Sequence, residues 1–96
     1  MTVKLTEELK KAAEHCVWFE PPEKAIQDVV RLAAYILTYG TTEDTHALRD
    51  QIDNETLIKC LDKAPPGIYD ERSWAYWNLV VGRYDPPPMP KRAFPK

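Results

Sequence analysis

Residues 22–40 decide the fold of this chain, and they read PEKAIQDVVRLAAYILTYG. Apolar residues recur in this segment at three- and four-residue spacing, which is the period of a helix with one buried face. They are Ile26, Val29, Val30, Ala33, Ile36 and Leu37. Pro22 suits the first turn of a helix, and Gly40 suits its end because glycine readily adopts a positive φ. We predict one long helix from Glu23 to Gly40, at the centre of the domain.

Helices are also predicted on both sides of this segment. On the N-terminal side, Thr6 provides a cap for a helix that runs to about Val17, with one apolar stripe facing the core. The stripe consists of Leu5, Leu9, Ala12, Ala13 and Cys16. On the C-terminal side, hydroxyls and acids at 41–44 start a helix over about 43–51, and Asp53 caps another that ends before the turn at 64–67. Because so few residues separate these last two helices, we expect them to pack against each other.

The aromatic segment at 70–82 is predicted to be a fifth helix. Asp70 is its cap and Gly82 its end. Tyr76 to Val81 would also suit a strand, because aromatic and β-branched residues are frequent there. We favour the helix, since the sequence offers no second strand as a partner. The residues that would share one face of this helix are Trp74, Trp77 and Val81.

From residue 83 onward the chain becomes a basic tail rich in proline. Five of the nine prolines lie in 83–96, so this segment suits neither a helix nor a central strand and is expected to be extended polyproline II. We therefore predict an all-α protein. It would be a compact single-domain bundle of about five helices over residues 1–82, followed by an extended proline-rich C-terminal tail over 83–96.

The composition excludes several classes of protein. Hydrophobic residues make up 44% and charged residues 29%, which is typical of a globular domain and not of a disordered chain. No apolar run is long enough to span a bilayer and the N-terminus lacks a secretory signal, so we expect a cytoplasmic protein without a membrane partner. The net charge is −2, but residues 83–96 carry +3 and leave −5 on residues 1–82. Such an acidic body argues against nucleic acid as a partner.

The residue types of catalytic and metal sites are present, but not in a recognised pattern. Cys16 and Cys60 are expected to be reduced and packed, with a disulfide between them left open. His15 beside Cys16, and His46 with Cys60, lack the ligand spacing of a zinc finger. The chain has no phosphate-cradling glycine loop and no GxSxG elbow, and its carboxylate pairs fall at predicted helix starts, where the helix dipole explains them. We expect no catalytic residue, no metal and no cofactor, and therefore no enzyme.

Aromatic residues near the C-terminus predict a surface for a protein partner. They lie on more than one side of a single helix, so they cannot all enter the same core, and exposed aromatic side chains favour docking. The partner-binding residues that we predict are Trp74, Tyr76, Trp77, Arg83, Tyr84, Lys91, Arg92 and Phe94. The alternative is that the tail folds back and its prolines stack on the same rings.

The two helices over about 43–62 also allow a second function, that of a helix-turn-helix DNA-binding regulator. The second of these helices would read the major groove. Its charged residues are Asp53, Glu55, Lys59, Asp62 and Lys63, a mixture that repels phosphate more than it attracts it. An ordinary pair of helices is therefore the preferred interpretation.

Several motifs together resemble a family of small bacterial proteins of uncharacterised activity. They are the WFEPP sequence at 18–22, TYG at 38–40, APPG at 64–67, RSWAYW at 72–77, GRY at 82–84 and the proline-rich tail, so the resemblance covers roughly residues 18–95. Members of this family are often encoded beside a nucleotidyltransferase-type toxin of the abortive-infection class. The resemblance implies an antitoxin-like or accessory partner of a nucleotidyltransferase, and it transfers no catalytic or ligand residue.

Overall fold

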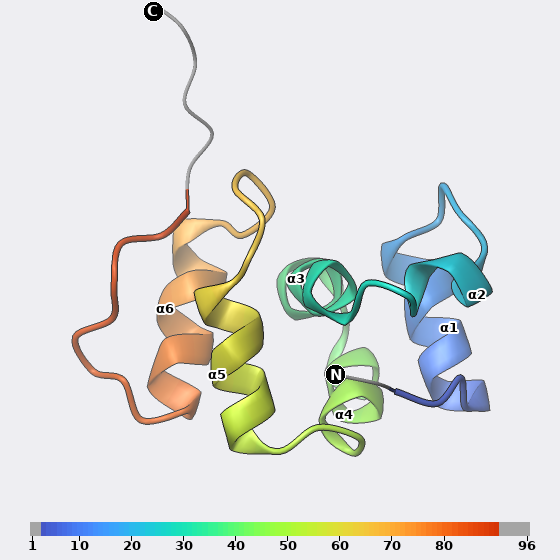
Figure 1. Ribbon diagram of the computed structural model, residues 1–96, viewed down its shortest axis with the longest axis horizontal. Coiled ribbons are helices and arrows are strands. Elements are labelled where there is room, and N and C mark those ends of the chain that lie inside the picture. Colours follow the sequence, from blue (N-terminus) through green and yellow to red (C-terminus); the bar gives the residue numbers. More distant parts are fainter. Residues whose placement is uncertain (1–2, 91–96) are drawn as a thin grey trace, which may run out of the picture.

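The computed structural model describes residues 3–90, and this part of the chain contains helices and no strand. Its helices are α1 (Glu7–Cys16), α2 (Pro22–Ala25), α3 (Val29–Tyr39), α4 (Thr42–Arg49), α5 (Asn54–Asp62) and α6 (Glu71–Val80). Helix α3 lies in the middle, with α1 and α2 on one side of it and α5 and α6 on the other (Figure 1). The prediction of a compact, all-α bundle is confirmed for the described residues, with six helices in place of about five.

The extra helix arises because the predicted helix over 23–40 is divided in two. Pro22 occupies the first turn of α2, as expected, but α2 ends after Ala25. Asp28 then caps α3, since its side chain accepts a hydrogen bond from the backbone N–H of Arg31 at 3.1 Å. An aspartate directly before an apolar helical run is a strong start signal. The prediction of one continuous helix was wrong, because Asp28 caps a new helix within the apolar pattern.

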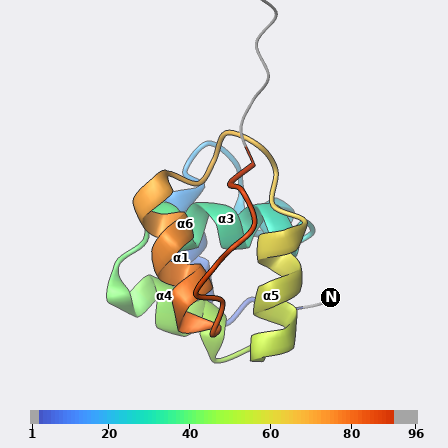
Figure 2. The ribbon, with the colours of Figure 1, turned by 90° about the vertical axis from the view of Figure 1, so that its left-hand side faces the viewer.

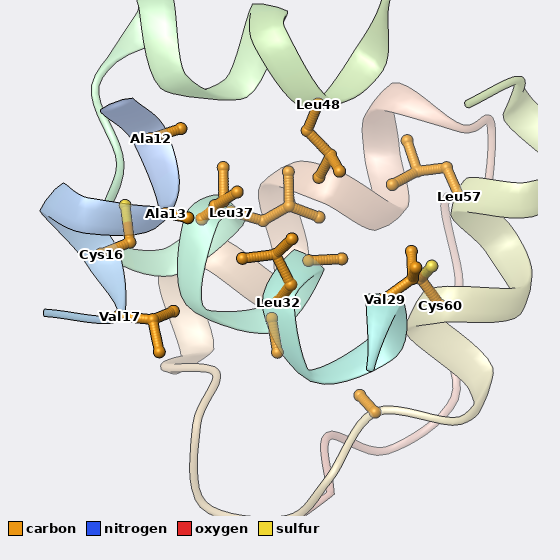
Figure 3. Close-up of a cluster of buried hydrophobic side chains, with 14 of the residues drawn as sticks. Ala12, Ala13, Cys16, Val17, Val29, Leu32, Leu37, Leu48, Leu57 and Cys60 are labelled. Carbon is orange, nitrogen blue, oxygen red and sulfur yellow. The ribbon is translucent and has the colours of Figure 1, made fainter. Parts of the chain in front are cut away.

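The core is built around α3, which contributes six buried residues. Figure 3 shows Leu32 and Leu37 of α3 among side chains from the other helices. The largest side chains that are fully buried are Leu9, Leu32, Ile36, Leu48, Leu57, Leu61, Val17, Asn78 and Cys60. Cys16 and Cys60 are both buried free thiols, so the possible disulfide is not formed.

Helices α4 and α5 were expected to pack against each other, but each packs mainly against a different helix. Helix α4 packs mainly against α1, and α5 packs mainly against α3. Helix α4 buries its apolar residues against α1, and α5 buries its own against α3. The chain therefore changes direction in the short connection at 50–53. The closely packed pair of helices that the sequence predicted over about 43–62 is therefore not what the structure shows.

The segment that follows α6 packs back against α5 and α6. Gly82 ends α6 with a φ of +87°, as the sequence predicted. The following residues run between α5 and α6 (Figure 2), where Nε1 of Trp74 donates to the carbonyl of Pro87 at 3.0 Å and Met89 packs against the core. Residues 87–89 thus contact the helical body, which agrees with the fold-back alternative for this segment.

Gly40 follows α3 for a different reason from the one predicted. Its φ is −77°, which any residue can adopt, so it is not the left-handed cap that the sequence suggested. A Cβ at this position would lie 2.5 Å from the carbonyl oxygen of Ile36 and 2.9 Å from Cβ of Asp44. The glycine is needed because α3 and α4 meet closely at this corner.

We predict that Gly40→Ala lowers the free energy of unfolding by roughly 1–2 kcal/mol, because the backbone must shift to admit the new methyl group. Urea denaturation followed by circular dichroism measures the change. Thr42→Ala, at a neighbouring exposed position, is the control and should change stability by less than about 0.5 kcal/mol. Equal stability of the two variants would contradict the close approach.

Candidate functional site

The residues predicted to bind a partner occupy different environments. Trp74 and Trp77 are only 5% and 6% exposed, so these two indoles belong to the core and not to a surface. Tyr76 and Tyr84 are 57% and 82% exposed, in keeping with the prediction that some of these rings remain outside. The phase of α6 explains the difference. Residues 74 and 77 share its inner face, while residue 76 lies about 100° around the helix from residue 77.

The basic part of the predicted surface contributes less than expected. Arg83 pairs with Asp62, with Nη1 donating to the carboxylate at 2.6 Å, so its charge is neutralised locally. Lys91, Arg92 and Phe94 lie outside the described residues. The described remainder of the predicted site is therefore the pair of exposed tyrosines, Tyr76 and Tyr84.

A second exposed group of aromatic residues was not predicted as a site. We call it the aromatic strip, and it consists of Trp18, Phe19, Tyr35 and Tyr39. Trp18 contacts Phe19 edge to face with 5.7 Å between ring centroids, Phe19 contacts Tyr35 in the same way at 5.6 Å, and Tyr35 lies 6.2 Å from Tyr39. Trp18 is 79% and Tyr39 61% exposed. Four aromatic side chains in sequential contact thus reach the surface in one place.

Arg31 holds the middle of the aromatic strip. Its guanidinium carbon lies 5.5 Å from the ring centroids of both Phe19 and Tyr35. Its Nη1 donates to the carboxylate of Glu20, a hydrogen bond that raises the pKa of Arg31 above its ordinary value. The two inner rings of the strip, Phe19 and Tyr35, therefore share one cation, whose charge is balanced by Glu20.

A sequence signal for the aromatic strip did exist. Arg31, Tyr35 and Tyr39 recur every four residues on α3, so they form a line along one side of that helix. Trp18 and Phe19 precede the Pro-Pro step that starts α2, and only the fold brings them beside this line.

A pocket of about 350 Å³ lies between the end of α3, one side of α4 and the first two turns of α6. We call it the arginine pocket, because Arg49 and Arg72 are its charged lining residues. The lining residues are Leu37, Gly40, Thr41, Thr42, Thr45, His46, Arg49, Arg72, Ser73, Tyr76 and Trp77. None of them is acidic. The guanidinium of Arg49 lies 5.9 Å from the ring centroid of Trp77, which forms part of the wall.

His15, Cys16 and Asp44 form the one group of three possible metal ligands in the part of the chain that the structure describes, with ligand atoms all within 4.8 Å of one another. Nδ1 of His15 donates to Oδ2 of Asp44 at 2.7 Å, and Sγ of Cys16 lies 3.8 Å from the same oxygen. Burial, followed by the charge of Asp44, raises the pKa of Cys16 to about 12. The thiol is therefore protonated at neutral pH, unlike an activated nucleophile or a preformed thiolate ligand.

The carboxylate of Asp44 already has a structural task in this cluster. It accepts from the backbone N–H of Thr41 at 3.0 Å while the hydroxyl of Thr41 accepts from the backbone N–H of Asp44, which makes a capping box at the start of α4. Because His15 belongs to α1, the same carboxylate also joins α1 to α4. The cluster acts as a hydrogen-bonded clamp between these helices, which spacing in the sequence could not reveal.

No protein-family model, no curated protein and no solved structure matches this chain. Within residues 3–90, none of the helices has the length and apolar character that crossing a membrane requires. The aromatic strip and the arginine pocket are the two surface features of the described residues that suit binding.

Proposed function

We propose that this chain is a non-enzymatic interaction protein that binds a protein partner through the aromatic strip. The observation that carries the proposal is the exposure of Trp18 and Tyr39 at the ends of a continuous set of aromatic contacts. Small proteins that work alone seldom expose connected aromatic groups, and aromatic residues dominate the binding energy of protein interfaces.

The packing of Arg31 within the strip supports this proposal. Arg31 packs on the rings of Phe19 and Tyr35 and pairs with Glu20, so these two inner rings are already held together before a partner binds. Preorganised side chains lose less conformational entropy on association than mobile ones. Because the central charges cancel, we expect the facing surface of the partner to be apolar and the affinity to depend little on salt.

The partner that we propose is a nucleotidyltransferase toxin, for which the chain would act as an antitoxin-like or accessory protein. This identity rests on the resemblance of residues 18–95 to the family encoded beside such toxins. Within the His15, Cys16 and Asp44 cluster the thiol stays protonated, which does not suit a catalytic nucleophile. No specific observation favours the helix-turn-helix alternative.

Co-expression with a nucleotidyltransferase toxin of the class that is often encoded beside members of that family tests the proposal. We expect the chain to restore growth and to form a complex that survives gel filtration. A Trp18→Ser/Tyr39→Ser double variant should lose rescue, because truncating an interface aromatic costs about 2 kcal/mol or more, so that each of the two changes lowers affinity by about 30-fold or more. Both side chains are exposed, so the fold should be kept.

Tyr84→Ser is the matched control, because Tyr84 is as exposed as Trp18 but follows α6 at the other side of the molecule from α1 and α2 (Figure 1). This variant should rescue growth like the wild type. Loss of rescue in Tyr84→Ser alone would move the interface to the C-terminal surface. A toxin that is neither neutralised nor bound by the wild-type chain would refute the antitoxin role.

A further inference from the structure

We infer that the arginine pocket is a binding site for a phosphate monoester attached to a planar organic group. The pocket shares no residue with the aromatic strip, so the inference does not depend on the proposed protein partner. It rests on the charge of the lining, on the kinds of hydrogen-bond donors present, and on the aromatic wall.

The charge of the pocket is opposite to that of the protein around it. Residues 1–82 carry a net charge of −5, yet the lining contains Arg49 and Arg72 and no acidic residue. Glu43 and Glu71 are next to lining residues in the sequence but are not part of the lining. Neither arginine belongs to an ion pair within residues 3–90. Two guanidinium groups facing one small pocket attract an anion and repel a cation.

The donors in the lining match a phosphate group better than a single carboxylate. A guanidinium offers several N–H donors in a fixed fork, and two of them can bind several oxygens of one phosphate. Hydroxyl groups of Thr42 and Ser73 add further donors at the same pocket. The guanidinium of Arg49 packs on the ring of Trp77, and this contact positions one of the two arginine side chains.

The rest of the pocket suits a planar group linked to the phosphate. Its volume of about 350 Å³ falls in the range of small-molecule sites and exceeds what one inorganic ion needs. Tyr76 and Trp77 both line it, and their rings meet edge to face with 5.0 Å between centroids. Tyr76 is largely exposed, so its ring is free to stack on a flat ligand at the mouth of the pocket.

Titration of the full chain with small probes, followed by two-dimensional NMR of backbone amides, tests this inference. The probes are phenyl phosphate, adenosine monophosphate, inorganic phosphate, phenol and adenosine. We expect the two monoesters to shift the amides of Thr42, Arg49, Ser73 and Tyr76, with inorganic phosphate weaker and the uncharged rings inactive. The two monoesters separate a phosphorylated aromatic side chain from a nucleotide as the source of the ligand. If neither monoester shifts these amides, or inorganic phosphate binds as well as both, the inference is wrong.

Two variants show whether the arginines and the tyrosine are responsible. Arg49→Gln/Arg72→Gln should weaken monoester binding on the order of 10- to 100-fold, the effect of losing charge-assisted hydrogen bonds. Lys59→Gln/Lys63→Gln removes the same charge from exposed positions on and after α5 and should leave binding nearly unchanged. Equal weakening by both double variants would indicate a general charge effect and overturn the site.

Tyr76→Ala keeps the test valid should the arginine variant fold poorly, because Tyr76 is exposed. It should reduce the affinity for the two monoesters about tenfold, in line with the loss of one stacking contact, and leave that for inorganic phosphate unchanged. An unchanged affinity for both monoesters in this variant would contradict the planar part of the inference.

Discussion

Replacing Trp77 with alanine is expected to lower the free energy of unfolding by about 3–5 kcal/mol, the usual cost of removing a large aromatic side chain from a core. Trp77 is buried on the inner face of α6, and its Nε1 donates to the carbonyl of Leu37 at 2.8 Å. This carbonyl belongs to the last turn of α3, where helical carbonyls lack an intrahelical partner. The variant therefore loses packing and also leaves a buried acceptor without its donor. Chemical denaturation followed by far-ultraviolet circular dichroism measures the loss.

Trp77→Phe separates these two contributions. The phenyl ring retains much of the packing but cannot donate to Leu37, so we expect a smaller loss that includes about 1–3 kcal/mol for the unsatisfied carbonyl. Tyr76→Ala, next to it on the exposed side of α6, should change stability by less than about 1 kcal/mol. If Trp77→Ala and Tyr76→Ala have the same free energy of unfolding, the indole of Trp77 does not connect α6 to α3 in the way described.

Local signals in the sequence predicted most helix starts correctly. The side chains of Thr6, Asp53 and Asp70 each accept a hydrogen bond from the backbone N–H three residues later, as their positions before apolar runs suggested. The same rule would have found the cap at Asp28. Apolar residues continue on both sides of Asp28 with helical spacing, however, and periodicity alone does not show where one helix stops and another begins.

The candidate site was only partly predictable, because it depends on contacts between distant residues. The idea that one helix cannot bury all its aromatic residues was sound, and the phase of α6 separates Trp74 and Trp77 from Tyr76. The packing partners of these rings do not follow from spacing. The approach of Phe19 to Tyr35 arises from the way α1 and α2 pack on α3. The convergence of Arg49 and Arg72 on one pocket arises from the way α4 and α6 pack around α3.

One corner of the fold depends on such distant contacts more than any other. At the end of α3, Leu37 accepts from Trp77 of α6, Gly40 allows α4 to approach, and the N–H of Thr41 turns to Asp44. The carboxylate of Asp44 accepts in turn from His15 of α1. Residues 37–44 thus connect α1, α3, α4 and α6. Asp44 supplies the carboxylate that makes the polar contacts of this corner with α1 and with Thr41.

We expect Asp44→Ala to lower the free energy of unfolding by about 2–3 kcal/mol at neutral pH. The variant leaves the backbone N–H of Thr41 without its acceptor, breaks the capping box and removes the partner of His15, and each such loss costs on the order of 1 kcal/mol or more. His15→Ala is the comparison variant. It should cost less, because His15 is more than half exposed and the capping box survives its removal.

The stabilisation from Asp44 should also depend on pH in a defined direction. Burial alone would raise the pKa of Asp44, but hydrogen bonds from His15 and from the backbone of Thr41 outweigh burial, so the pKa in the folded protein lies below its ordinary value of 3.8. A lowered folded-state pKa means that the carboxylate contributes fully above pH 3.8 and that this contribution is lost as the pH falls through the folded-state pKa. The difference in stability between wild type and Asp44→Ala should therefore be fully present above pH 3.8 and shrink as the pH falls below that value. Urea denaturation of both proteins from pH 7 to pH 2 measures it, and a difference that grows as the pH falls below 3.8 would show that the ionised carboxylate does not hold this corner together.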